Sequence, residues 1–223
     1  MTIGRVFEIT STVATVVVLI AVLWARYIPA KSPNDGRNIS GRTVSVADRP
    51  MVGSKAAPMV MVILSDFECP FCGQFARLTW PLIEDEYVSK GLLTVVFKHL
   101  PLSIHDSAVP AAIAAACAGR QSAFWGMHDR IFADQSRLDE TALETYARTL
   151  DLDLDAWQRC RQTGDNGSVG ADEAEARDLG IGGTPTFLLG SRLGDSSVKV
   201  TEVLSGALPI ERFRESLDRL IAD

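Results

Sequence analysis

The feature that most restricts the fold is a short apolar run that ends just before a pair of cysteines. Pro58 to Leu64 reads PMVMVIL, and such an uninterrupted run is typical of a strand buried on both faces of a sheet. From Phe71 the apolar residues recur at helical spacing, with a bend expected at Pro81, and Leu92 to Leu100 is rich in β-branched residues. This order predicts a strand, a helix and a second strand that is parallel to the first and reached by a right-handed crossover.

The second half of the chain predicts a block of helices followed by further strands. Residues 103–179 carry apolar stripes at helical spacing and an acid-rich final segment that stops at Gly180, a glycine suited to a helix C-terminus. Strand patterns return at Thr184 to Gly190 and around Val198 to Leu204, and the residues between them fit a hairpin. An apolar face near the C-terminus predicts a closing helix. The whole pattern indicates an α/β fold in which a helical insertion of residues 103–179 interrupts a mixed sheet.

The N-terminal residues predict a membrane anchor that precedes the globular fold. Ile9 to Ala25 contains no charged residue over 17 positions, which is the lower limit for a helix that spans a bilayer. The segment is long for a signal peptide, and no convincing small-residue cleavage site follows it. We therefore expect an uncleaved transmembrane helix within residues 1–28. A linker with one short extended piece around Arg42 to Val46 would occupy residues 29–51, and the domain would occupy residues 52–223.

Composition argues against several classes of protein. The 223 residues carry a formal net charge of −6 and no long basic stretch, so we expect no binding to nucleic acid. Four cysteines are too few for a miniprotein built on disulfides. A single C-x-x-C without a second cysteine pair does not complete the four-ligand set of a structural zinc site. We therefore expect neither a metal nor a cofactor.

The spacing of Cys69 and Cys72 favours electron exchange over metal binding. Cys69 ends the loop after the first expected strand, and Pro70 suits the first turn of a helix, where its missing N–H needs no partner. Unpaired N–H groups and the helix dipole stabilise an anion there, which lowers the pKa of the Cys69 thiol and makes it a nucleophile toward disulfides. Cys72 lies one turn later on the same helix face and can resolve a mixed disulfide.

Four segments together resemble a known family. They are SDFECPFC, HLPLSIHDSAVPAA, CAGRQSAFWGMHDRIF and GIGGTPTFLLG, and the resemblance that they carry covers about Val52 to Ala222. This combination resembles the DsbA-like branch of the thioredoxin fold, a family of thiol-disulfide oxidoreductases. The resemblance implies a thioredoxin-like fold with an inserted helical subdomain, here preceded by the N-terminal transmembrane helix.

The resemblance also implies the roles of six residues at the site. Cys69 would be the nucleophile and Cys72 the resolving thiol. The peptide bond between Thr184 and Pro185 would be cis, which would hold Thr184 against the Cys69 sulfur and leave backbone groups free to pair with an extended substrate. The two residues between the cysteines, Pro70 and Phe71, would support the active-site turn.

The other two cysteines can be interpreted in two ways. Cys117 and Cys160 both lie on expected helices, where each would be a small buried apolar residue. Alternatively they form a structural disulfide across the insertion, as a second disulfide does in some relatives. We favour the disulfide, because an oxidising compartment permits it.

Two positions depart from the family pattern. Many relatives carry a carboxylate six residues before the first active cysteine, where this chain has Ile63. The sequence therefore does not identify the group that transfers a proton to the buried thiol. Phe71 stands where the strongest oxidases of the family have histidine. We interpret His105 and His128, both in the insertion, as surface or capping residues and not as acid–base groups.

The function implied by the resemblance is oxidation of cysteines in exported proteins by the Cys69–Cys72 disulfide. The substrates would be extended or unfolded, a membrane redox partner would re-oxidise the pair, and the protein would be a monomer. Such chemistry needs an oxidising compartment, which places the domain on the periplasmic or extracytoplasmic side of the inner membrane, on a single-pass anchor. The alternatives are a disulfide reductase or isomerase, and a membrane-tethered redox sensor.

Overall fold

The computed structural model describes residues 39–164 and 167–222. The expected anchor of residues 1–28 lies outside this part of the chain, as do residues 29–38 of the expected linker. None of the helices described here combines the length and the hydrophobicity needed to span a bilayer.

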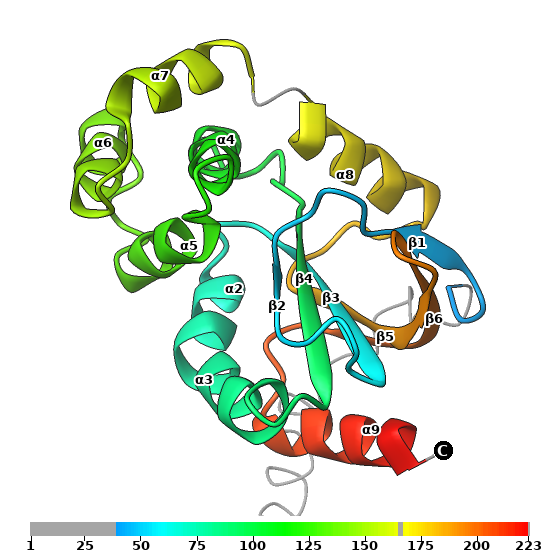
Figure 1. Cartoon of the computed structure of the whole chain (residues 1–223). Coiled ribbons are helices and arrows are strands. Elements are labelled where there is room, and N and C mark those ends of the chain that lie inside the picture. The colour runs from blue at the N-terminus through cyan, green and yellow to red at the C-terminus, as the bar shows by residue number, and fades with distance from the viewer. Residues whose placement is uncertain (1–38, 165–166, 223) are drawn as a thin grey trace, which may run out of the picture. The chain divides into compact units, whose positions relative to one another are not determined.

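The described residues contain one mixed sheet of six strands in the order β1-β6-β5-β3-β4-β2 (Figure 1). Two neighbouring strands, β3 (Met59–Ser65) and β4 (Leu93–His99), are parallel, and every residue of both is buried. β5 (Thr186–Leu193) runs antiparallel to β3, and β6 (Ser197–Ser205) forms the expected hairpin with β5. The parallel pair and the hairpin agree with the sequence patterns.

The two edge strands begin earlier than the domain boundary expected at residue 52. β1 (Thr43–Ser45) pairs with β6, and β2 (Met51–Val52) pairs with β4, so the sheet includes part of the segment we assigned to a linker. These strands have three and two residues, which is too short for an alternating apolar pattern. Their structure comes from backbone pairing with neighbouring strands that would otherwise be free edges.

The helix after β3 changes its winding along its length. It comprises α2 (Pro70–Gln74), a π-helical stretch η1 (Phe75–Thr79), α3 (Trp80–Ile83) and a second π-helical stretch η2 (Glu84–Val88). The first widened turn ends at Thr79, two residues before Pro81, which has no N–H to donate to the carbonyl group four residues back. The expected irregularity at Pro81 is therefore present, although it takes the form of altered helical turns.

Alternate side chains of β3 pack against helices on opposite faces of the sheet. Met61 and Ile63 belong to a cluster with Phe75 of η1 and with apolar residues of the C-terminal helix α9 (Ile210–Ala222). Val60 and Val62 belong to a separate cluster that includes residues of α8 (Ser168–Asp178). Because both faces of β3 are packed against helices, the core holds the end of this strand in place.

The expected helical insertion contains five helices, counted over the described residues. They are α4 (Ala108–Gly119), α5 (Phe124–Ala133), α6 (Glu140–Thr149), α7 (Leu154–Gln162) and α8. Helices α4 to α7 gather at one end of the sheet, near α2 (Figure 1). Cys117 of α4 and Cys160 of α7 form a disulfide with an S–S distance of 1.97 Å. Trp157 of α7 is fully buried and donates its indole N–H to the carbonyl oxygen of Ala114, at 3.0 Å.

The disulfide in the insertion predicts a measurable contribution to stability. Replacing both Cys117 and Cys160 with alanine should lower the free energy of unfolding by up to about 4 kcal/mol, because the bond joins residues 43 positions apart and restricts the unfolded chain. Urea unfolding followed by circular dichroism measures the loss.

The control for this measurement is a protein with Cys69→Ala and Cys72→Ala, in which the insertion bond is the one disulfide that reductant can break. Its urea midpoint should fall when reductant is added. A protein in which all four cysteines are replaced with alanine should have the same midpoint with and without reductant. Equal midpoints with and without reductant would contradict a stabilising role of the bond.

Candidate active site

The two remaining cysteines lie where β3 meets α2. Cys69 precedes the first helical turn with extended backbone angles, and Pro70 occupies the first helical position. The N–H of Cys69 donates to the carbonyl of Asp66 at 3.2 Å, and the carbonyl of Cys69 accepts the N–H of Gly73 at 3.1 Å. The turn is thus held by backbone hydrogen bonds on both sides of Cys69, and both thiols are free and buried.

Hydrogen bonds stabilise the thiolate form of Cys69. The largest effect comes from the side chain of Cys72, and the pKa of Cys69 falls from 9.0 to about 5 even though burial acts in the opposite direction. Thr184 and the backbone N–H groups of Phe71 and Cys72 lower this pKa further. At neutral pH the reduced protein therefore carries a negative charge on the Cys69 sulfur.

Cys72 has the opposite environment, although it is one helical turn away. Burial raises the pKa of its thiol far above the ordinary range, and the hydrogen bond to Cys69 raises it again. Its sulfur also lies 3.5 Å from the backbone N–H of Asp66. The pair is therefore unequal: Cys69 is ionised, and Cys72 keeps its proton and shares it with Cys69.

The segment before β5 closes the site from the far end of the chain. The peptide bond between Thr184 and Pro185 is cis, and the Cys69 sulfur lies 3.5 Å from the carbonyl oxygen of Thr184. The antiparallel register of β3 and β5 pairs Leu64 with Thr186, which brings this turn to the end of β3. Phe71, the last residue before Cys72, is 59% exposed at the surface beside the pair. All six residues named from the sequence thus gather at one place.

A buried carboxylate lies next to the loop that carries the cysteines. Asp66 follows β3, and its side chain is fully buried. Its carboxylate accepts the backbone N–H groups of Glu68 and Leu102, both at 2.8 Å, and contacts Nδ1 of His105 at 2.7 Å. Ile63, at the position where relatives carry a carboxylate, packs in the apolar cluster under α9.

The two histidines of the insertion do not lie where we expected. His105 is half-buried against Asp66 and does not cap a helix. His128 is buried among aromatic rings, with the ring of Phe132 at 4.8 Å and that of Trp125 at 5.1 Å, and it contacts the Asp129 carboxylate at 2.8 Å. The surface interpretation was wrong for both, because it rested on local sequence and could not include contacts made by the fold.

Gln135 is a further site residue that the sequence did not reveal. It follows α5, and its amide nitrogen donates to the carbonyl oxygens of Phe67 and Cys69, both at 2.9 Å. A Cβ atom on Gly73 would meet the side-chain oxygen of Gln135 at 1.8 Å, so this position favours glycine. The insertion therefore contacts the cysteine loop directly, across 66 positions of sequence.

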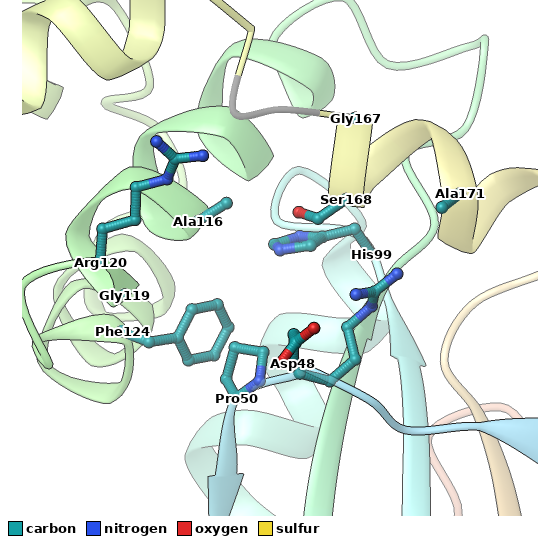
Figure 2. Close-up of a pocket in the computed structure, with 11 residues that line it drawn as sticks. Asp48, Pro50, His99, Ala116, Gly119, Arg120, Phe124, Gly167, Ser168 and Ala171 are labelled. Atoms are coloured by element: carbon teal, nitrogen blue, oxygen red, sulfur yellow. The ribbon is translucent and has the colours of Figure 1, made fainter. Parts of the chain in front are cut away.

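A separate pocket of about 580 Å³ lies between α4, α8 and the loop before β2. Figure 2 shows His99, at the end of β4, and Phe124 among the side chains around it. Neither active-site cysteine lines this pocket. Within the described residues, no group of three or more His, Cys, Asp or Glu side chains is placed to hold a metal ion.

Comparison with known proteins gives a family match over most of the chain. The model of the thioredoxin family matches residues 45–206. The Na⁺/H⁺ antiporter NhaA 3 of Salinispora tropica is 38% identical over 160 residues, which cover 70% of this chain and 24% of the antiporter. A probable disulfide bond formation protein D of Bacillus anthracis is 25% identical over 138 residues, which cover 61% of this chain and 59% of that protein. The chain thus spans about a quarter of the length of the antiporters it matches.

Solved structures share the fold. BdbD of Bacillus subtilis superposes with a TM-score of 0.70 at 18% identity and covers 83% of this chain and 98% of its own. The α-DsbA1 protein of Wolbachia pipientis superposes with a TM-score of 0.68 at 23% identity and covers 79% of this chain and 92% of its own.

The low pKa of Cys69 predicts a stability difference between the reduced and oxidised proteins that depends on pH. A depressed thiol pKa stabilises the folded reduced protein most above the unfolded value of 9.0, and this stabilisation is lost as the pH falls through about 5. The oxidised protein has no such thiol. The unfolding free energy of the reduced form, minus that of the oxidised form, should therefore rise between pH 5 and pH 9.

Urea unfolding of both redox states at several pH values measures this difference. The Cys117→Ala, Cys160→Ala protein is the suitable background, because its redox state depends on the active pair alone. A difference that stays constant over this pH range would show that Cys69 titrates as an ordinary thiol.

Proposed function

Because this chain belongs to the thioredoxin family, we propose that it is a thiol-disulfide oxidoreductase that oxidises cysteine pairs in exported proteins. The observation that carries the proposal is the unequal pair of thiols, one with its pKa lowered to about 5 and the other with its pKa raised by burial. Exchange chemistry needs a stable leaving thiolate and a resolving thiol that stays close by, and this pair supplies both.

The reaction begins with the oxidised protein. A substrate thiolate attacks Cys69 in the Cys69–Cys72 disulfide, a new S–S bond forms to Cys69, and Cys72 leaves and takes up a proton. A second substrate thiolate then attacks the substrate sulfur of this mixed disulfide, and Cys69 leaves as a thiolate. Two electrons pass from the substrate to the protein. The low pKa of Cys69 favours this second step, because a stable thiolate leaves readily.

Substrate binding fits the backbone around the pair. Thr184 lies beside the Cys69 sulfur just before β5 begins, and the preceding Gly182 is exposed. An extended peptide can pair with backbone groups of such a segment as an added strand does, which favours unfolded substrates over folded ones. The exposed Phe71 offers apolar contact beside the reacting sulfur.

Cellular location follows from the chemistry and from the N-terminal segment. A protein that donates its disulfide requires an oxidising compartment, and the disulfide between Cys117 and Cys160 fits the same environment. The uncharged segment from Ile9 to Ala25 supports a single-pass anchor in the inner membrane with the domain on the extracytoplasmic side. A membrane partner would then re-oxidise the pair, and the protein would act as a monomer. The transport named for the Salinispora relative belongs to a protein of which this chain matches a quarter, so we assign no transport here.

Substitution of the resolving cysteine predicts trapping of substrates. In a Cys72→Ala protein the Cys69 thiolate can attack a disulfide of an exported protein, which forms a mixed disulfide and releases one substrate thiolate. No second thiol of the protein can resolve this bond, so covalent adducts with several exported proteins should accumulate. Non-reducing electrophoresis before and after treatment with reductant measures them. The matched controls are Cys69→Ala, which lacks the nucleophile, and the double substitution. A single trapped protein would favour the redox sensor, and no adduct at all would contradict the exchange function.

The reduction potential of the Cys69–Cys72 pair predicts the direction of exchange. A value near −120 mV is that of a strong oxidase, and a value near −270 mV is that of a reductase. We expect the oxidising end of this range, because a thiolate stabilised at Cys69 favours the reduced protein and therefore the oxidation of its substrates. Equilibration with glutathione buffers measures it. A potential near −270 mV would contradict the proposed oxidation and would favour disulfide reduction as the function.

A further inference from the structure

Building on the proposed exchange reaction, we propose that His105 is a positioning residue that holds a positive charge beside the Cys69 thiolate, with Asp66 as its fixed partner. Pro70 and Phe71, the two residues between the cysteines, carry no charge. The proposed cation therefore comes from outside the C-x-x-C turn, in the loop before α4.

Asp66 fixes the position of the imidazole relative to the cysteine loop. Its carboxylate is fully buried and sits three residues before Cys69, whose N–H donates to the Asp66 backbone carbonyl. Oδ2 of this carboxylate accepts the N–H of Leu102 at 2.8 Å and lies 2.7 Å from Nδ1 of His105. A fully buried carboxylate of this kind requires compensating partners, and a protonated imidazole is one of them.

A second carboxylate fastens the other side of the same loop. Glu68, directly before Cys69, accepts the backbone N–H of Ser107 at 2.6 Å. Residues 102 and 107 are thus bound to residues 66 and 68, with His105 between them. The backbone on either side of His105 is therefore held to the segment that precedes Cys69, and the imidazole itself contacts Asp66.

The charges around His105 favour its protonated form. The groups that face it are Asp66, Cys69 and Glu68, and all three are negative when ionised; the adjacent Asp106 is exposed. Asp66 has the largest effect and raises the pKa of His105, burial acts against it, and the charge on Cys69 raises this pKa further. Electrostatic interaction is mutual, so an imidazolium stabilised by the Cys69 thiolate stabilises that thiolate in return.

The same arrangement predicts that the two partners have unequal effects. Without the imidazolium, the buried carboxylate of Asp66 would keep its two backbone N–H donors but would have no positive partner, and its charge would oppose ionisation of the Cys69 thiol. Removal of the Asp66 charge would lower the pKa of His105, so the imidazole would lose its proton more readily. The negative charge of Asp66 and the positive charge of His105 would then be lost together. Loss of His105 should disturb Cys69 more than loss of the Asp66 charge.

The test is a pH titration of the Cys69 thiolate in the reduced full-length protein, followed by its absorbance at 240 nm. Cys72 does not interfere, because burial raises its pKa far above the range of the titration. His105→Gln should raise the Cys69 pKa by about one unit, which is the lower end of the effect of a nearby opposite charge. Asp66→Asn should raise it by less. His105→Arg, which keeps a cation and donors for Asp66, should restore most of the low pKa.

A second readout is the equilibrium with glutathione. A thiolate that is tenfold less stable in the reduced protein shifts this equilibrium tenfold toward the oxidised protein, equivalent to about 30 mV. His128→Gln is the matched control, because it makes the same change in a histidine that also contacts an aspartate, at 2.8 Å, but is not joined to the cysteine loop by hydrogen bonds. It should leave both readouts unchanged.

The possible outcomes separate this inference from the proposed function. If the wild-type protein has a low Cys69 pKa and His105→Gln changes thermal stability alone, His105 is a structural tie and the inference fails while the proposed function stands. If wild-type Cys69 titrates as an ordinary thiol, both fail. If His105→Gln does not fold, His105→Arg and Asp66→Asn decide: equal pKa values in both and in the wild type would overturn the inference.

Discussion

The chemistry of this protein depends on one negative charge, at the sulfur of Cys69, that is stable inside a nearly closed site. Burial of an anion is costly, and the structure offsets this cost with hydrogen bonds, first from Cys72 and then from Thr184 and backbone N–H groups. The same burial acts on Cys72 without comparable compensation, and it raises the pKa of that thiol. Two identical side chains one turn apart thereby acquire different chemical roles.

The fold holds this charge in place by bringing three distant segments to the end of β3. The turn before β5 contains Thr184, the segment after α5 contains Gln135, and the loop before α4 contains His105. Thr184 and Gln135 contact Cys69 itself, and His105 contacts Asp66, three residues before it. The helical insertion therefore supports the site directly as well as covering one end of the sheet.

A buried charge cluster connects the insertion to the sheet behind the site. Asp172 of α8 is fully buried; it forms an ion pair with Arg49 at 2.7 Å, another with Lys98 of β4 at 3.1 Å, and accepts the backbone N–H of His99 at 2.9 Å. Such a cluster is stable only when all its members are present, because loss of one leaves an unpaired buried charge. It links α8 to the end of β4, and β4 lies parallel to the strand that carries the cysteines.

The sequence by itself determined the central strands, the helical insertion and the position of the cysteine pair. Each of these follows from the local pattern of apolar residues and from the order of segments, and the tertiary contacts agree with that pattern. It also indicated the segment around Pro185 through a family resemblance. It indicated an extended piece around Arg42 to Val46, where β1 lies, but it did not indicate that this piece pairs with β6. It also did not indicate β2 or the roles of Asp66, His105 and Gln135. Their contacts join residues 39 and 66 positions apart, so only the packed structure decided which polar groups surround the sulfur.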